Sequence, residues 1–363
     1  MNAEPVIVAR AHSPVHRAVA RLPPGYFALV MGTGIVSIGL YDAGFFVLSD
    51  ALMWIAVGAY ILLWILYLWR AIAFRHEVLS DLRDPTIAFA FFTIVAGSDV
   101  LGVRLAQQGL NGIAMPLLLF AGALWFVFGY VLPWQVMMTR DGAPILARTN
   151  GTWFIWAVAS QSLAVGMSQL QADFEGTAAR LIGLFAVLAW SVGVILYAAI
   201  GMLVLLRVVR YGITAEQFDP TYWVAMGALA IAVVAGSGIV SMEPTPMVDA
   251  VRPLIAATVV IFWTFCAWLI PLLLGAGVWR HVLRKVPLRY VAALWSMVFP
   301  IGMFAVASIS MGRADGLPLA ERIGHVGLAV AVIVWAIVFT AMLHRIGQVL
   351  WATLRWRATE DRG

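Results

Sequence analysis

Hydroxyl residues that could contact a solute recur at one spacing in two apolar stretches of this sequence. The stretch GTGIVS contains Thr33 and Ser37, and the stretch GSGIVS contains Ser237 and Ser241. Residues four apart share one face of a helix, so each pair presents two hydroxyls in the same direction. A phosphate-binding loop is excluded, because the Gly-x-x-x-x-Gly-Lys-Ser/Thr spacing is absent. We therefore expect either solute contact or a hydrogen bond from each hydroxyl to the carbonyl one turn earlier.

Similar polar clusters occur in three further apolar stretches. They read AGSD, ASQS and ASIS, and they add Ser98, Gln161 and Ser308 to the residues that could line a polar path. The first stretch also has a packing role, because its glycines allow two helices to approach closely. We expect packing on one side of such a helix and solute contact on the other.

Asp99 is the only acidic residue within the apolar stretches. Ionisable residues inside a membrane commonly mark ion paths and proton relays. A negative charge would repel an anion, so we expect that Asp99 faces away from such a path, pairs with Arg104 or carries a proton.

The composition requires that these residues be positioned by membrane helices. The chain of 363 residues is 63% hydrophobic and only 11% charged, whereas soluble domains contain about 25% charged residues. The apolar runs are continuous and suit helices of ~20 residues rather than the short alternating strands of a membrane barrel. The sequence predicts an all-α polytopic membrane protein with one transmembrane unit over residues 1–363. The predicted helix cores are 26–41, 51–69, 86–103, 112–132, 152–171, 181–206, 222–241, 253–274, 291–310 and 326–343.

The basic residues predict the orientation of these helices. With ten spans, 18 of the 23 Lys and Arg residues lie at the termini and on the loops of one side. Because cytoplasmic loops carry the excess of positive charge, we expect both termini to be cytoplasmic. The cytoplasmic N-terminal segment is residues 1–22, and the cytoplasmic tail is residues 346–363. We expect the plasma membrane, the inner membrane in a bacterium. Topology also accounts for the basic composition, so nucleic acid is not an expected partner.

Odd-numbered and even-numbered helices differ in polarity. Ser, Thr, Gln and charged residues are several times more frequent in the odd-numbered cores. Polar groups in hydrocarbon need partners or water, so the first, third, fifth, seventh and ninth helices should line a central pore. The even-numbered helices should face lipid or neighbouring subunits. The polarity pattern repeats five times, which indicates five related helical hairpins.

Two runs carry a resemblance to a known family. RLPPGYFALVMGTGIVS at 21–37 and ALWSMVFPIGMFAVAS at 293–308 resemble the tellurite-resistance/dicarboxylate transporter family, which includes slow anion channels and malate and sulfite carriers. The resemblance implies five hairpins around a narrow pore and a homotrimer with one pore per protomer. It also implies a gate formed by the phenylalanine of the ninth helix beside a proline, here Phe299 and Pro300.

The expected function is transmembrane passage of small anions or malate-like four-carbon dicarboxylates through a channel gated by Phe299. The alternative is a proton-coupled dicarboxylate or sulfite carrier that uses Asp99. An enzyme is not expected, because the spans contain no paired carboxylates or metal-ligating histidines, and no cofactor or metal is implied. A membrane sensor is disfavoured, because the loops are too short for an output domain. Cys266 is the single cysteine, so no internal disulfide forms.

Overall fold

The computed structural model describes residues 13–138, 144–314 and 316–360, with side chains described to Trp356. Parts of the predicted termini lie outside the described residues, namely 1–12 of the N-terminal segment and 361–363 of the tail. Arg140, one of the 18 basic residues counted for the orientation, also lies outside them. Helices form throughout the described chain, and no strand occurs in it, so the all-α fold class is confirmed. The ten long helices are α2 (Ala28–Asp42), α3 (Phe46–Ala73), α5 (Phe92–Gln107), α6 (Asn111–Met138), α8 (Phe154–Leu170), α9 (Gly176–Tyr211), α10 (Val224–Val240), α11 (Pro246–Val278), α12 (Trp295–Ala314) and α13 (Pro318–Glu360).

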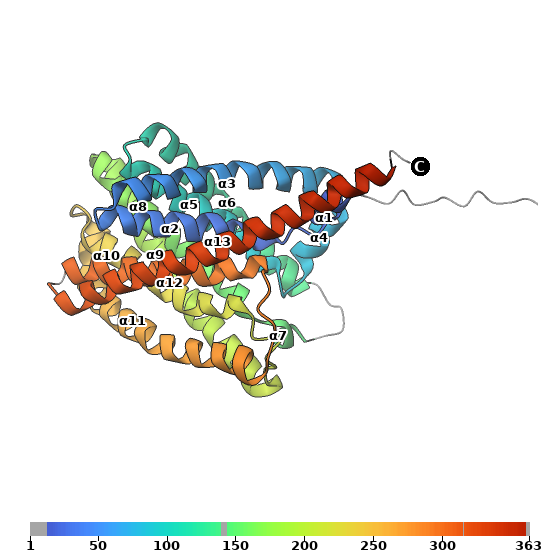
Figure 1. Ribbon diagram of the computed structural model, residues 1–363. Helices are drawn as coiled ribbons and strands as arrows, with labels where there is room; N and C mark the ends of the chain where they lie inside the picture. Colours follow the sequence, from blue (N-terminus) through green and yellow to red (C-terminus); the bar gives the residue numbers. More distant parts are fainter. Residues whose placement is uncertain (1–12, 139–143, 315, 361–363) are drawn as a thin grey trace, which may run out of the picture.

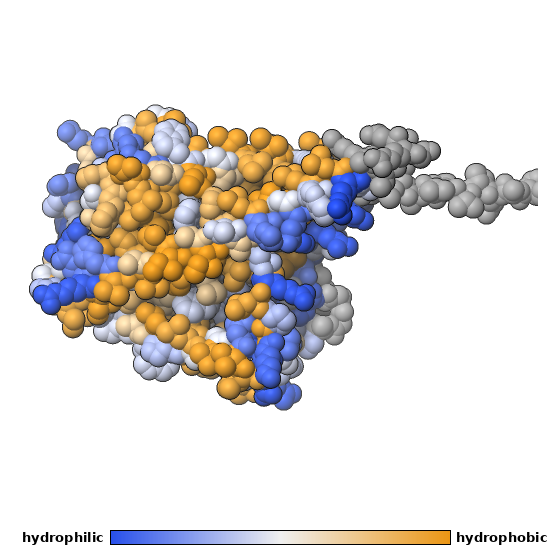
Figure 2. All heavy atoms as spheres, in the orientation of Figure 1, coloured by the Kyte–Doolittle hydropathy of each residue, from blue (hydrophilic) through white to orange (hydrophobic). Residues whose placement is uncertain are grey.

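Within the described residues, nine of these helices are long and apolar enough to span a membrane. Four of the nine spans include a few residues before the α-helix, as in Pro24–Asp42, and α8 is the helix that does not qualify. Figure 2 shows an apolar belt over the visible face, with hydrophilic residues gathered towards both ends. The protein is therefore a polytopic membrane protein, and the tenth span stays a prediction.

The helices pack as five hairpins around a closed inner ring. Within each hairpin, α2 packs on α3, α5 on α6, α8 on α9, α10 on α11, and α12 on α13. The inner helices contact one another in the order α2, α5, α8, α10, α12 and back to α2. Figure 1 shows the long helices running alongside one another, with α13 extending past the others at one end.

Burial separates the two sets of helices as the polarity pattern predicts. In the most apolar stretch of each of the four inner spans other than α8, 72% to 100% of the residues are buried, whereas the corresponding stretches of the five outer spans have only 17% to 28% buried. Gly32 allows the close helix packing that we expected of the glycines. A Cβ at this position would lie only 3.1 Å from Val298 Cγ1 of α12. Most polar residues of the odd-numbered helices are therefore inside the protein, while the outer helices face the surroundings.

A second ring forms where the inner helices begin. Each inner helix starts with a short 3₁₀ turn: η1 (Pro24–Phe27), η2 (Ala88–Phe91), η3 (Gly151–Trp153), η5 (Pro220–Trp223) and η7 (Ala292–Leu294). These turns contact one another in that order, and η7 contacts η1. A Cβ on Gly151 would lie 2.4 Å from the backbone of Thr221, so this close approach of η3 to η5 requires glycine. All five inner helices therefore have their N-termini at the same end of the molecule.

The same local motif, an Asp or Asn followed two residues later by Thr, occurs at or just before the start of three of the 3₁₀ turns. Asp84 accepts hydrogen bonds from the backbone N–H (2.9 Å) and the hydroxyl (2.7 Å) of Thr86. Asn150 with Thr152, and Asp219 with Thr221, repeat this pairing. Burial alone would raise the pKa of Asp84, but the bonds from Thr86 and the ion pair with Arg148 (2.8 Å) outweigh burial and hold that pKa below its ordinary value.

Candidate functional site

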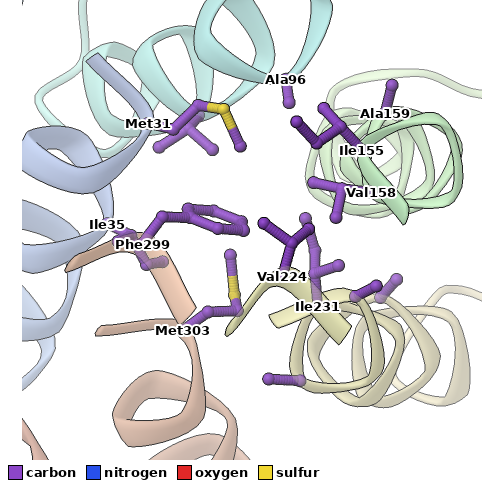
Figure 3. Packing of buried hydrophobic residues seen from close by; sticks show 14 of the residues in the cluster. Met31, Ile35, Ala96, Ile155, Val158, Ala159, Val224, Ile231, Phe299 and Met303 are labelled. Atoms are coloured by element: carbon purple, nitrogen blue, oxygen red, sulfur yellow. The ribbon is translucent and has the colours of Figure 1, made fainter. Parts of the chain in front are cut away.

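Phe299 lies at the centre of the inner ring. Its side chain is 1% exposed, and Figure 3 shows its ring pointing into the space between α2, α8, α10 and α12, near Met31, Ile155 and Met303. Pro300 follows within α12. Proline has no N–H to bond the carbonyl four residues earlier, so it locally weakens the helix at this position. The axis of the ring is thus filled by an aromatic side chain beside a weakened turn.

A cavity of about 70 Å³ adjoins this constriction. All five inner helices contribute to its wall, and Ile35, Ile231 and Met303 line it as well as lying around Phe299 (Figure 3). Its other wall residues include Asp42 and Gln107, near the C-terminal ends of α2 and α5. The cavity therefore extends from Phe299 towards the end of the molecule opposite the 3₁₀ turns, and it has room for a few water molecules.

Asp99 lines this cavity. Its Oδ2 accepts a hydrogen bond from Ser162 Oγ at 2.6 Å, its Oδ1 has no hydrogen-bond partner, and the side chain is 1% exposed. Two of the three expectations for Asp99 are therefore wrong. It does not face away from the axis, and it does not pair with Arg104, because Arg104 extends towards α3. The third expectation, that Asp99 carries a proton, stays a prediction.

Arg104 forms a buried cluster that the sequence did not reveal. The guanidinium contacts Ser37 Oγ (2.9 Å) and Ser49 Oγ (3.1 Å) through Nε, and Asp50 Oδ1 (2.7 Å) through Nη2. The Arg104 side chain is fully buried, and it also bonds Gln108. The sequence suggested Asp99 as the partner of Arg104, whereas Ser49 and Asp50 escaped notice because they precede the predicted core 51–69.

Five hydrogen bonds of one kind join neighbouring hairpins, and they explain several of the hydroxyls singled out in the sequence. In each, an aromatic side chain of the outer helix of one hairpin meets the inner helix of the next hairpin, and the fifth bond closes on the first hairpin. We call these contacts the seam bonds: Tyr60 Oη with Ser98 Oγ (2.9 Å), Trp125 Nε1 with Ser160 Oγ (2.9 Å), Trp190 Nε1 with the Ala232 carbonyl (3.0 Å), Trp263 Nε1 with Ser308 Oγ (2.8 Å) and Trp335 Nε1 with Thr33 Oγ1 (3.0 Å).

The structure thus directs Thr33, Ser98 and Ser308 towards outer helices. Ser98 and Ser308 also donate to carbonyls one turn earlier, both at 2.7 Å. Ser37 is held in the Arg104 cluster. These four hydroxyls lie outside the wall of the axial cavity, because aromatic and guanidinium donors on other helices hold them.

The other candidate residues also lie outside the cavity wall. Gln161 donates to the Trp190 carbonyl of α9 (3.1 Å). Ser237 is half-buried, and the exposed Ser241 donates to the Ser237 carbonyl at 3.0 Å. Of the polar residues proposed from the sequence, the structure brings Asp99 to the axial cavity, while Ser162 and Gln107, which were not proposed, line it too.

Comparison with known proteins agrees with this architecture. The sequence model of the voltage-dependent anion channel family, SLAC1, matches residues 21–343. An uncharacterized membrane protein of Mycobacterium tuberculosis (strain H37Rv) is 47% identical over 155 residues, which cover 43% of this chain and 79% of that protein. An uncharacterized transporter of Methanocaldococcus jannaschii is 25% identical over 89% of this chain and 93% of its own length. The sulfite efflux pump SSU1 of Trichophyton rubrum is 21% identical over 90% of this chain and 92% of that protein.

Proposed function

Because the chain belongs to the voltage-dependent anion channel family, SLAC1, we propose that it passes small anions across the plasma membrane along the axis of its inner ring. Malate-like dicarboxylates and sulfite are the first anions to test, the latter because one relative is named as a sulfite efflux pump. The observation that carries the proposal is the closed ring of five inner helices with Phe299 at its centre. We propose a channel-like path that opens when Phe299 moves aside.

The direction of the inner helices supports a path for anions. All five begin at the ring of 3₁₀ turns, so the partial positive charges of their N-termini gather at one mouth. These dipoles attract an anion without binding it as tightly as a fixed cation would, which suits passage. The five inner helices would thereby raise the local concentration of anions at that mouth.

The assembly we propose is a homotrimer with one path per protomer, with both termini in the cytoplasm. The outer helices expose many large apolar side chains, among them Ile61, Phe126 and Ile195. Such surfaces suit lipid tails and contacts between subunits.

The gate is tested by measuring anion flux in liposomes. Purified protein should pass malate, sulfite or nitrate, and Phe299→Ala should increase the flux, because it removes the ring that fills the axis. The matched control is Phe304→Ala: Phe304 is also a buried phenylalanine of α12, but it stacks on Trp263 of the outer helix α11. The control should leave flux near the wild-type level. Absence of flux in both the wild type and Phe299→Ala, with folded protein, would refute the proposal.

A second candidate function is a proton-coupled carrier, and the position of Asp99 in the cavity wall favours it. In this case uptake of malate or sulfite would follow an imposed pH gradient, and Asp99→Asn would abolish that dependence. Uptake that ignores the gradient in the wild type would exclude coupling and leave the channel.

A further inference from the structure

Two buried polar atoms lack a hydrogen-bond partner at the end of the molecule where the 3₁₀ turns lie. They are Arg207 Nε, near the C-terminal end of α9, and Tyr222 Oη, in η5. Arg207 is 6% exposed and Tyr222 is 5% exposed. Buried polar groups in proteins nearly always have a partner, so each of these two atoms requires one.

The positive charge of Arg207 is not balanced by an acid. Its Nη1 donates to the Gly212 carbonyl (3.0 Å) and its Nη2 donates to Gln217 Oε1 (3.2 Å), and both acceptors are neutral. No carboxylate of the described residues lies within ion-pair distance of this guanidinium. Asp219, at the end of the same loop, accepts hydrogen bonds from Thr221 instead. A buried cation without a counter-ion is costly.

The Tyr222 hydroxyl lies close to this unbalanced charge. The charge of Arg207 acts on the hydroxyl more strongly than that of Asp219 does, yet the two side chains do not bond one another, since neither free atom has a partner. The Tyr222 ring stacks on Phe218, with ring centroids 4.9 Å apart, and Arg280, just past α11, donates to the Phe218 carbonyl at 2.6 Å. A guanidinium N–H and a phenol O–H thus stand ready to donate beside one positive charge.

We infer that Arg207 Nε and Tyr222 Oη together bind one small monovalent anion, such as chloride or nitrate, where α9 meets the ring of 3₁₀ turns. One negative charge balances the guanidinium, and both groups donate a hydrogen bond to the anion. Water satisfies the two donors but not the charge, so an anion is favoured over water. Neither residue lines the axial cavity. The site is therefore separate from that cavity, and its existence does not depend on the proposed function.

The melting temperature of the purified protein in detergent tests this inference, with chloride compared with gluconate at equal ionic strength. Gluconate is too large for a site enclosed between helices, whereas chloride that binds the folded protein stabilises it by mass action. We expect chloride to raise the melting temperature of the wild type by roughly 2–5 °C at a hundredfold excess over its dissociation constant. The rise should saturate with chloride concentration as it does for a single site.

Tyr222→Phe removes the hydroxyl and keeps the ring that stacks on Phe218. In chloride this variant should melt below the wild type, and the chloride concentration for half the effect should rise at least about tenfold, because the anion loses a donor. In gluconate it should melt at or above the wild type, because the wild type then buries a hydroxyl without a partner.

Arg207→Gln should abolish the effect of chloride, since it removes the charge. If Arg207→Gln does not fold, Tyr222→Phe still decides. The matched control is Tyr197→Phe, which removes the hydroxyl of a half-buried tyrosine of α9 whose ring packs on Phe154, with centroids 5.3 Å apart. This control should respond to chloride as the wild type does.

Equal melting temperatures of the wild type in chloride and in gluconate would overturn the inference. An effect of Tyr222→Phe that is the same in both salts would also overturn it, because water alone would then satisfy the hydroxyl. Neither outcome concerns the flux of anions, so the proposed function would still stand.

Discussion

Among single residues, Arg104 ties three helices together. From α5 it reaches Ser37 of α2 and both Ser49 and Asp50 of α3, and its guanidinium lies 4.7 Å from the centre of the Tyr41 ring. A buried guanidinium is stable only when its donors are satisfied, and here Nε, Nη1 and Nη2 each have an acceptor. The cluster lies near the C-terminal end of α2, close to the mouth of the axial cavity.

We expect Arg104→Met to lower the free energy of unfolding by about 2–4 kcal/mol, because Ser37 and Ser49 lose a donor and Asp50 loses its partner. Unfolding by heat or denaturant in detergent measures the effect. Arg345→Met is the control: Arg345 is exposed and bonds Gln348 within the same helix, so its loss should cost under about 0.5 kcal/mol. A similar cost for both variants would contradict a stabilising role for the cluster.

The sequence indicated which residues are inside the protein but not where each hydroxyl points. Thr33 and Ser308 belong to a repeated polar pattern, so their burial on inner helices could be predicted. Their direction depends on Trp335 and Trp263, which lie far away in the sequence on outer helices. Because the rotation of an inner helix about its axis is set by such distant contacts, a periodic pattern alone does not separate the axial face from the outward face.

At the level of helices, the seam bonds are the feature that repeats most regularly. In hydrocarbon the hydrophobic effect does not drive helices together, so packing and hydrogen bonds between helices must hold the hairpins in register. One seam bond, as defined above, lies between each pair of neighbouring hairpins. The hairpins themselves could be predicted from alternating polarity, whereas the 3₁₀ turns could not, because they depend on contacts between loops such as that of Gly151 with Thr221.

A double-mutant cycle tests the seam bond between α11 and α12. Trp263→Phe and Ser308→Ala should each destabilise the protein, and the two changes should couple by about 0.6–1.7 kcal/mol, as hydrogen bonds between membrane helices do. Unfolding in detergent gives the four free energies. The control pairs Trp263→Phe with Ser241→Ala, because Ser241 is exposed and bonds only its own helix. Coupling of equal size in the control would show that the effect is not specific to the bond.

For the whole molecule, the ring brings the first and the last hairpin of the chain into contact. The last hairpin packs against the first through α12 and α2, and Trp335 bonds Thr33. The ring therefore closes only when the last hairpin is in place. Its parallel inner helices also give the molecule two different ends, with the 3₁₀ turns at one end and the axial cavity opening towards the other.

The two ends make the orientation testable by cysteine labelling in intact cells. Cys266 is fully buried and should not react, so the natural sequence gives a low background. Asp249 and Arg284 are exposed near opposite ends of α11. If the 3₁₀ turns and both termini face the cytoplasm, Asp249→Cys should react with a membrane-impermeant maleimide from outside, and Arg284→Cys should react only after the membrane is permeabilised. The reverse pattern would invert the topology and place the cavity mouth with Asp42 in the cytoplasm, so that anions would meet the cavity first on leaving the cell.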